Sequence, residues 1–247
     1  MSRTFVIGDI HGCLEEFREL VRLVGYRQGS DRLVLVGDLM DRGPDPVGCV
    51  RLAQELGAEG VLGNHEESHI RWRKHEDRRA ATGKKNPMKP YPEIRAAQNA
   101  ALSEQDVLWF KDLPTVMEIH PGLLVCHAGL EPAFPASRQT DAVIRVRYVD
   151  ADGEMVGFEE GSLDQPANTH YWSTRWPGPE SVIYGHAVHS FEDVRVDRFD
   201  GGACYGIDTG CCFGGRLTAA IVVEGQVQEF AQVQARERYY TSAFYHR

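Results

Sequence analysis

The sequence lacks any run of about 18 consecutive apolar residues, so we expect no segment to cross a membrane. We also expect no signal peptide, because residues 1–9 lead directly into a predicted strand. Its six cysteines show none of the paired spacings of a zinc knuckle. Together these absences predict a cytoplasmic protein with reduced thiols.

Positive charge is also in short supply. The chain has 27 Lys and Arg against 36 Asp and Glu, which gives a formal net charge of −9. Non-specific binding to nucleic acid depends on Lys and Arg, so a nucleic-acid partner is disfavoured. An anionic substrate is not excluded, because bound metal ions can outweigh the overall charge at a site.

Strands and helices alternate in the first third of the chain. Apolar runs at 3–8, 33–37 and 59–63 predict buried strands, and the periodicity of 14–24 and 46–56 predicts helices between them. This pattern is typical of a mainly parallel sheet in an α/β fold, with functional loops at the carboxyl ends of the strands. The second half predicts strands at 122–129, 181–187 and 203–210, and hairpins at 143–158 and 217–231.

Residues 69–95 differ from the rest, because they are basic, poor in aliphatic side chains and interrupted by three prolines. We interpret them as a helix that runs into a loop, and both a cap over the site and a solvated insertion remain open. The length suits one large domain. We therefore predict a single domain over 1–247 with a cap or insertion at 69–95.

Polar side chains follow the predicted strands at their carboxyl ends. Residues i and i+2 of a strand point the same way, so Asp9 and His11 could share one ion. Carboxylates, imidazoles and an amide form a ligand set that suits Mn, Fe or Zn. A bridging carboxylate can hold two metals roughly 3.5–4 Å apart, the arrangement used to hydrolyse phosphate esters. The residues at the strand ends are Asp9, His11, Asp38, Asn64, His65, His127 and His186.

Four motifs occur in a fixed order: GDIHG at 8–12, GDLMDRG at 37–43, GNHE at 63–66 and HAG at 127–129. Their order and spacing resemble the signature of PPP-type metallophosphoesterases in the calcineurin-like superfamily. YGHAVHS at 184–190 supplies a late histidine. The resemblance is greatest to bacterial and phage serine/threonine phosphatases of the lambda phosphatase type. It implies a sandwich of two mixed β-sheets flanked by helices.

The resemblance also implies roles for individual residues. Asp9 and His11 would bind the first of two divalent metals, most readily Mn, and Asp38 would bridge both. Asn64, His127 and His186 would complete the second site. A hydroxide between the metals would then attack phosphorus in line, and no covalent phospho-enzyme would form.

The remaining implied roles concern the proton and the phosphate. His65 would protonate the leaving oxygen, with Asp41 orienting its ring. Arg42 and Asn64 would bind phosphate oxygens. For a second phosphate-binding arginine we favour Arg175, and Arg145 and Arg147 remain alternatives. The other histidines, His69 among them, are expected to be surface or structural residues.

The motifs leave four functions open. The Asp-Arg pair at 41–42 and the GNHE motif favour a serine/threonine protein phosphatase acting on a phosphoprotein or phosphopeptide. A symmetrical dinucleoside tetraphosphate hydrolase, with a small nucleotide as substrate, is the alternative. An RNA-end phosphatase is weaker, since the chain is acidic. A non-catalytic metal-binding module would be expected to have lost a ligand or His65, and none is lost.

Overall fold

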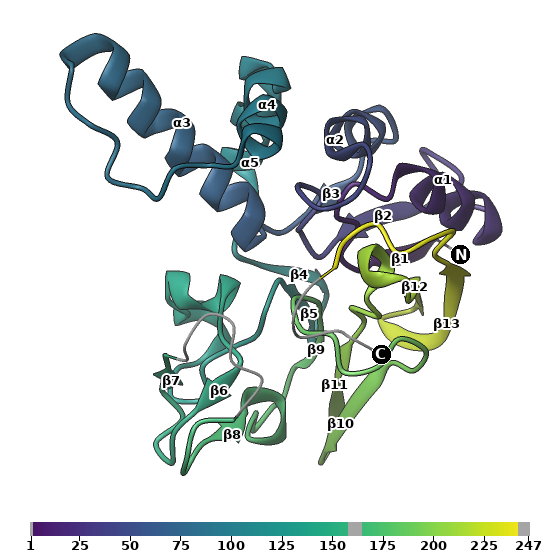
Figure 1. The fold of residues 1–247 in the computed structure, drawn as a ribbon. Coiled ribbons are helices and arrows are strands. Elements are labelled where there is room, and N and C mark those ends of the chain that lie inside the picture. The colour runs from purple at the N-terminus through teal and green to yellow at the C-terminus, as the bar shows by residue number, and fades with distance from the viewer. Residues whose placement is uncertain (1, 158–164, 242–247) are drawn as a thin grey trace.

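The computed structural model describes residues 2–157 and 165–241 (Figure 1). The described helices are α1 Leu14–Leu23, α2 Pro46–Glu55, α3 Asn64–Thr82, α4 Glu93–Ala101 and α5 Glu104–Asp112. The strands are β1 Arg3–Ile7, β2 Arg32–Leu35, β3 Glu59–Gly60, β4 Val116–His120, β5 Leu123–Cys126, β6 Tyr148–Val149, β7 Met155–Val156, β8 His170–Tyr171, β9 Ser181–Tyr184, β10 Arg195–Phe199, β11 Gly202–Gly206, β12 Arg216–Val223 and β13 Gln226–Gln234. None of the described helices is both long enough and apolar enough to span a membrane.

The first sheet has the strand order β13-β12-β1-β2-β3. Strands β1, β2 and β3 are parallel, as the alternation of strands and helices predicts. Strand β12 returns antiparallel to β1, and β13 forms a hairpin with β12. The parallel strands place their carboxyl ends at one edge of this sheet.

The second sheet has the order β10-β11-β9-β5-β4. Its central strand, β9, is parallel to both β5 and β11, whereas the edge strands β4 and β10 are antiparallel to their neighbours. Both sheets are therefore mixed.

The two sheets pack face to face through an apolar layer. Side chains alternate along each strand, so Val6 and Val34 face the second sheet, and Val125 and Ile183 face the first. The opposite side of β1, represented by Phe5, packs with residues of α1 and α2. The predicted sandwich of two mixed sheets with flanking helices is thus confirmed.

The structure differs from the sequence prediction at the edges. Strands β4 and β10 were not predicted, and a small third sheet has the order β7-β6-β8. The predicted hairpin over 143–158 is shorter, because Asp141–Ile144 forms a 3-10 turn and only Tyr148–Val149 pairs with Met155–Val156. Val143 and Ile144 are buried in the core next to this small sheet, so tertiary packing overrides their strand propensity.

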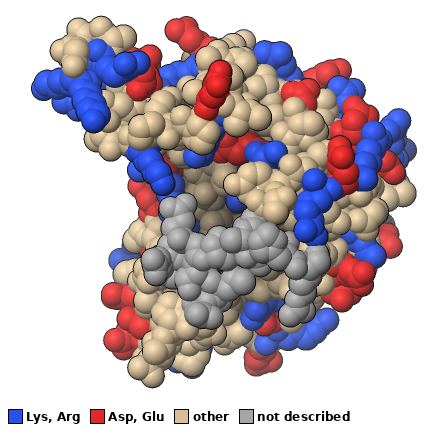
Figure 2. Space-filling model, viewed as in Figure 1, with Lys and Arg blue, Asp and Glu red and all other residues tan. Residues whose placement is uncertain are grey.

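The segment at 69–95 forms an arm. Helix α3 continues to Thr82 and extends away from both sheets, and α4 begins at Glu93 after an extended loop (Figure 1). Lys and Arg side chains gather at the far end of α3 (Figure 2). The arm stands beside the sheets, and a cap role for it stays a prediction.

The packing predicts which truncation should destabilise the fold. Ile183→Ala removes a fully buried side chain between the sheets and should cost about 2–5 kcal/mol of unfolding free energy. Leu108→Ala, at a side chain that is 56% exposed, should cost less than about 1 kcal/mol. Urea denaturation of both variants checks this, and similar losses would contradict the assignment of the inter-sheet core.

Candidate metal centre and acid dyad

The predicted ligands meet where the strands of both sheets end. Asp9 follows β1, Asp38 lies just beyond β2, and Asn64 opens α3 shortly after β3. His127 follows β5, and His186 lies two residues beyond β9. The backbone N–H of His186 donates to the Asp9 carboxylate at 3.0 Å, so the two sheets are joined at the site itself. The topology thus brings residues separated by up to 177 positions together.

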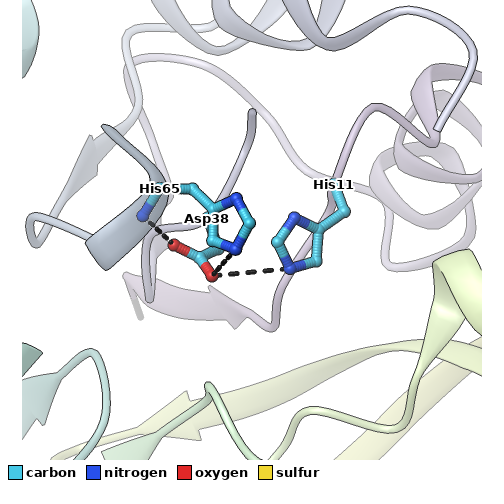
Figure 3. Close-up of side chains that lie close together, drawn as sticks. All are labelled: His11, Asp38 and His65. Atoms are coloured by element: carbon cyan, nitrogen blue, oxygen red, sulfur yellow. Dashed lines mark hydrogen bonds and ion pairs between the residues drawn. The ribbon is translucent and has the colours of Figure 1, made fainter. Parts of the chain in front are cut away.

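Asp38 lies at the centre of this group. Its Oδ1 is 3.4 Å from His127 Nε2, and its Oδ2 is 3.4 Å from His11 Nε2. His65 Nε2 lies 3.8 Å from the same Oδ2, and the His65 backbone N–H donates to Oδ1 at 3.0 Å (Figure 3). The carboxylate therefore presents one oxygen to each of two histidine groups, as a bridging ligand requires.

Two imidazoles are oriented by the backbone. His11 Nδ1 lies 2.8 Å from the carbonyl of Met40, and His127 Nδ1 lies 2.8 Å from the carbonyl of Val36. A carbonyl only accepts, so each Nδ1 carries a proton and the Nε2 of each ring faces Asp38. This backbone orientation of a metal-binding imidazole is common around protein metal sites.

Asn64 contacts two histidines on the other side of Asp38. Asn64 Oδ1 lies 3.0 Å from His127 Nε2 and 2.9 Å from His186 Nδ1. The Nε2 atom of His186 is buried and has no hydrogen-bond partner among the described residues. An amide oxygen accepts, so His186 Nδ1 carries the ring proton and the buried lone pair of Nε2 is left to bind a cation.

The electrostatics of the buried groups agree with this. Burial and the nearby charge of Asp208 raise the pKa of Asp9 well above its usual range. Burial and the Arg42 guanidinium hold the pKa of His11 well below its usual range. Burial lowers the pKa of His127, but the Asp38 and Asp9 carboxylates outweigh it and raise this pKa to about 9, so the centre favours positive charge. The donor set fits divalent metal ions.

His65 and Asp41 form a dyad beside this centre. His65 Nδ1 donates to Asp41 Oδ2 at 2.5 Å, which leaves His65 Nε2 facing the Asp38 side of the site. Burial opposes ionisation of Asp41, but hydrogen bonds from His65 and His69 outweigh it and hold the pKa of this carboxyl well below its usual range. Asp41 is thus a permanent anion that fixes the ring of His65.

Arg42 lies between the dyad and His11. Its Nη1 lies 2.6 Å from His11 Nε2, and its Nη2 lies 3.3 Å from His65 Nε2. The guanidinium also packs over the ring of Phe213 at 5.1 Å. Arg42 therefore lies where a phosphate oxygen between the centre and the dyad would need a partner.

The second predicted arginine is not brought to the ligands. Arg175 is exposed, and within the described part of the chain its side chain makes no hydrogen bond or ion pair with a predicted ligand. Arg147 Nη2 instead lies 3.5 Å from the carbonyl of His186, and Arg145 pairs with Glu67 at 2.6 Å. Of these three arginines, Arg147 contacts a predicted ligand, His186. The role of Arg175 stays a prediction.

Glu66 has a role that the sequence did not reveal. Its fully buried carboxylate accepts three backbone N–H bonds, from Asp38 at 2.7 Å, Leu39 at 2.9 Å and Met40 at 3.0 Å. Asp38 and Asp41 both have positive φ, at 54° and 70°, a conformation that costs free energy in non-glycine residues. Glu66 therefore holds the loop that presents both aspartates.

His69 was expected to be a surface or structural residue. It is fully buried, and its Nε2 lies 3.0 Å from Asp41 Oδ1. It follows His65 by four residues on α3, so both rings lie on one helix face. This spacing is the signal that could have identified it from the sequence.

Comparison with known proteins gives the family. The model of the calcineurin-like phosphoesterase family matches residues 2–199, so the chain belongs to that family, whose members are metal-dependent hydrolases.

Individual relatives are similar over most of their length. The asymmetrical bis(5'-nucleosyl)-tetraphosphatase PrpE of Bacillus cereus strain Q1 is 29% identical, with 86% of this chain and 87% of that protein covered. The symmetrical bis(5'-nucleosyl)-tetraphosphatase of Methylococcus capsulatus is 27% identical, with 92% of this chain and 94% of that protein covered.

Two solved structures share the fold. One, provisionally assigned as a diadenosine tetraphosphatase, is 31% identical, has a TM-score of 0.73, and covers 94% of this chain and 93% of its own. The other, a Saccharomyces cerevisiae serine/threonine phosphatase, is 15% identical, has a TM-score of 0.51, and covers 96% of this chain and 80% of its own. The second likeness supports the fold alone.

The contacts of Glu66 generate a prediction. Glu66→Ala leaves three buried N–H groups without an acceptor and should lower the unfolding free energy by about 3 kcal/mol or more. Turnover should also fall, because the loop carrying Asp38 and Asp41 loses its support. Glu67→Ala, at the next and partly exposed position, is the matched control. Urea denaturation and initial rates check the pair, and equal losses would show that Glu66 has no special role.

Proposed function

We propose that this protein hydrolyses dinucleoside tetraphosphates. The observation that carries the proposal is the near full-length similarity to bis(5'-nucleosyl)-tetraphosphatases, combined with an acid dyad next to a cluster of predicted metal ligands. The preference for a phosphoprotein substrate, drawn from the Asp-Arg pair and GNHE, is not supported by these relatives. The alternative substrate, a small nucleotide, is the better one.

The residues support hydrolysis of a phosphoanhydride as follows. Divalent metal ions, when bound by Asp9, His11, Asp38, Asn64, His127 and His186, supply an activated water and neutralise phosphate oxygens. His65 would hold a proton on Nε2 for the oxygen of the leaving nucleotide, with Asp41 fixing its ring through Nδ1. Arg42 would neutralise a phosphate oxygen between the dyad and His11.

The test compares two substrates side by side. We expect kcat/KM for diadenosine tetraphosphate to exceed that for a phosphothreonine peptide at least about 100-fold, measured with Mn²⁺. The products give the position of the cut, since ADP alone means symmetrical cleavage and ATP with AMP means asymmetrical cleavage. A preference for the peptide would refute the proposal and favour a protein phosphatase function.

The acid role generates a separate prediction. His65→Asn should lower kcat on phenyl phosphate, whose leaving oxygen is strongly basic, by about 10²- to 10⁴-fold, because that oxygen loses its proton donor. The number of metal ions bound per chain should stay the same, since the proposal assigns His65 to the dyad and not to the ligands. Mass spectrometry of metals after gel filtration measures the second quantity. Loss of one metal ion in this variant would instead make His65 a ligand, which its position near His11 and Asp38 would permit.

A further inference from the structure

Each carboxylate oxygen of Asp41 accepts two hydrogen bonds. One of the two on each oxygen comes from Arg95 of the arm. Arg95, on α4, is 2.9 Å from Asp41 Oδ1 through Nε and 2.8 Å from Oδ2 through Nη2. His65 donates to the same Oδ2, and His69 to the same Oδ1. The Arg95 contact is therefore a bidentate fork on a carboxylate that is only 6% exposed.

Asn99 acts on the same carboxylate through His69. It lies four residues after Arg95, so both side chains lie on one face of α4. Its Nδ2 lies 3.0 Å from His69 Nδ1 and 3.0 Å from the His69 carbonyl. An amide nitrogen only donates, so His69 Nδ1 accepts and the ring proton stays on Nε2, facing Asp41.

The Arg95 side chain is held in place by Tyr91, another residue of the arm. Its guanidinium lies 4.2 Å from the centroid of the Tyr91 ring. Tyr91 stacks on Trp72 of α3 with centroids 4.0 Å apart and an interplanar angle of 7°, and its hydroxyl is 2.7 Å from Ser68 Oγ. The loop before α4 is thus fastened to α3, which also carries His65 and His69.

We propose that Arg95 is a positioning residue, which with Asn99 fixes the plane of Asp41 so that His65 keeps the orientation needed to protonate the leaving oxygen. This inference rests on the acid role of His65 in the proposed function. A carboxylate bonded only to His65 could rotate about its Cβ–Cγ bond and carry the ring with it. The four hydrogen bonds to Asp41 prevent that rotation. A small error in the placement of a general acid strongly lowers its contribution to the rate.

A residue that merely stabilises the fold would behave differently. Loss of a well-placed acid matters most when the leaving oxygen is strongly basic, and least when it leaves readily without a proton. Phenyl phosphate and p-nitrophenyl phosphate differ chiefly in this respect, because phenolate is much more basic than p-nitrophenolate and the two substrates otherwise share the phosphate and the ring. Neither contains a nucleotide, so failure with diadenosine tetraphosphate would refute the proposed function and leave this comparison valid.

The test uses Arg95→Gln in the full chain with Mn²⁺. We expect kcat on phenyl phosphate to fall about 10- to 100-fold with KM nearly unchanged, and kcat on p-nitrophenyl phosphate to fall much less. Arg95→Lys should restore part of the loss, because one ammonium can bond one oxygen of Asp41 but cannot form the fork. Arg79→Gln, at an exposed arginine paired with Glu76 in the same arm, is the matched control and should change neither rate.

A second measurement does not depend on turnover. The Nδ1 proton of His65, assigned as the imidazole NMR signal that disappears in His65→Asn, should broaden in Arg95→Gln through faster exchange with water. It should be unchanged in Arg79→Gln. Equal losses of kcat on both aryl phosphates, or an unchanged His65 signal, would overturn the proposal. If Arg95→Gln does not fold, Arg95→Lys serves in both measurements with smaller changes in the same direction.

Discussion

The contacts of the Asp38 carboxylate determine the form of the site. It is 2% exposed, and a buried anion is stable only where donors or cations surround it. One of its oxygens faces His127 from the second sheet, and the other faces His11 from the first. The two sheets must therefore meet with their strand ends aligned, and the valine and isoleucine layer between them holds that alignment.

This arrangement requires a strained backbone. Five site residues have positive φ: His11, Asp38, Asp41, Arg42 and His186. Each such residue costs about 1–3 kcal/mol, and the conformation persists only where its surroundings fix it. The hydrogen bonds of Glu66 do this for one loop, and the bond from the His186 N–H to Asp9 does it for another. Gly185 allows the second approach, because a Cβ at that position would lie 2.0 Å from Asp9 Oδ1.

The sequence predicts what depends on local pattern. Buried strands such as β1 and β9 are short apolar runs followed by polar residues, so their ends and the side chains at those ends are visible without a structure. Strand β10, RVDRF, has no such pattern, because charged residues interrupt it, and two of these, Arg195 and Asp197, pair with each other. It becomes a strand only through its ladder with β11.

Residues that act through other residues were harder to predict. Arg95 lies 54 positions from Asp41, in a segment whose composition is that of a solvated surface. Nothing in its neighbourhood marks it apart from the other arginines of the arm, since its role comes from where α4 lies against α3. Glu66 was visible as part of GNHE, but its bonds are to backbone groups, which carry no sequence signal.

The contacts also explain why the motifs do not distinguish the two substrate classes. Asp41 bonds to His65, His69 and Arg95, and Glu66 bonds to the backbone of the loop at 38–40. Both residues therefore support the proposed acid and the predicted metal ligands, which would act on the phosphorus and its leaving oxygen. A phosphopeptide and a dinucleoside tetraphosphate both present a phosphorus with a leaving oxygen to these groups. Substrate preference must accordingly arise from surfaces beyond them, and the arm of α3 and α4 is the element that reaches outward from the dyad (Figure 1).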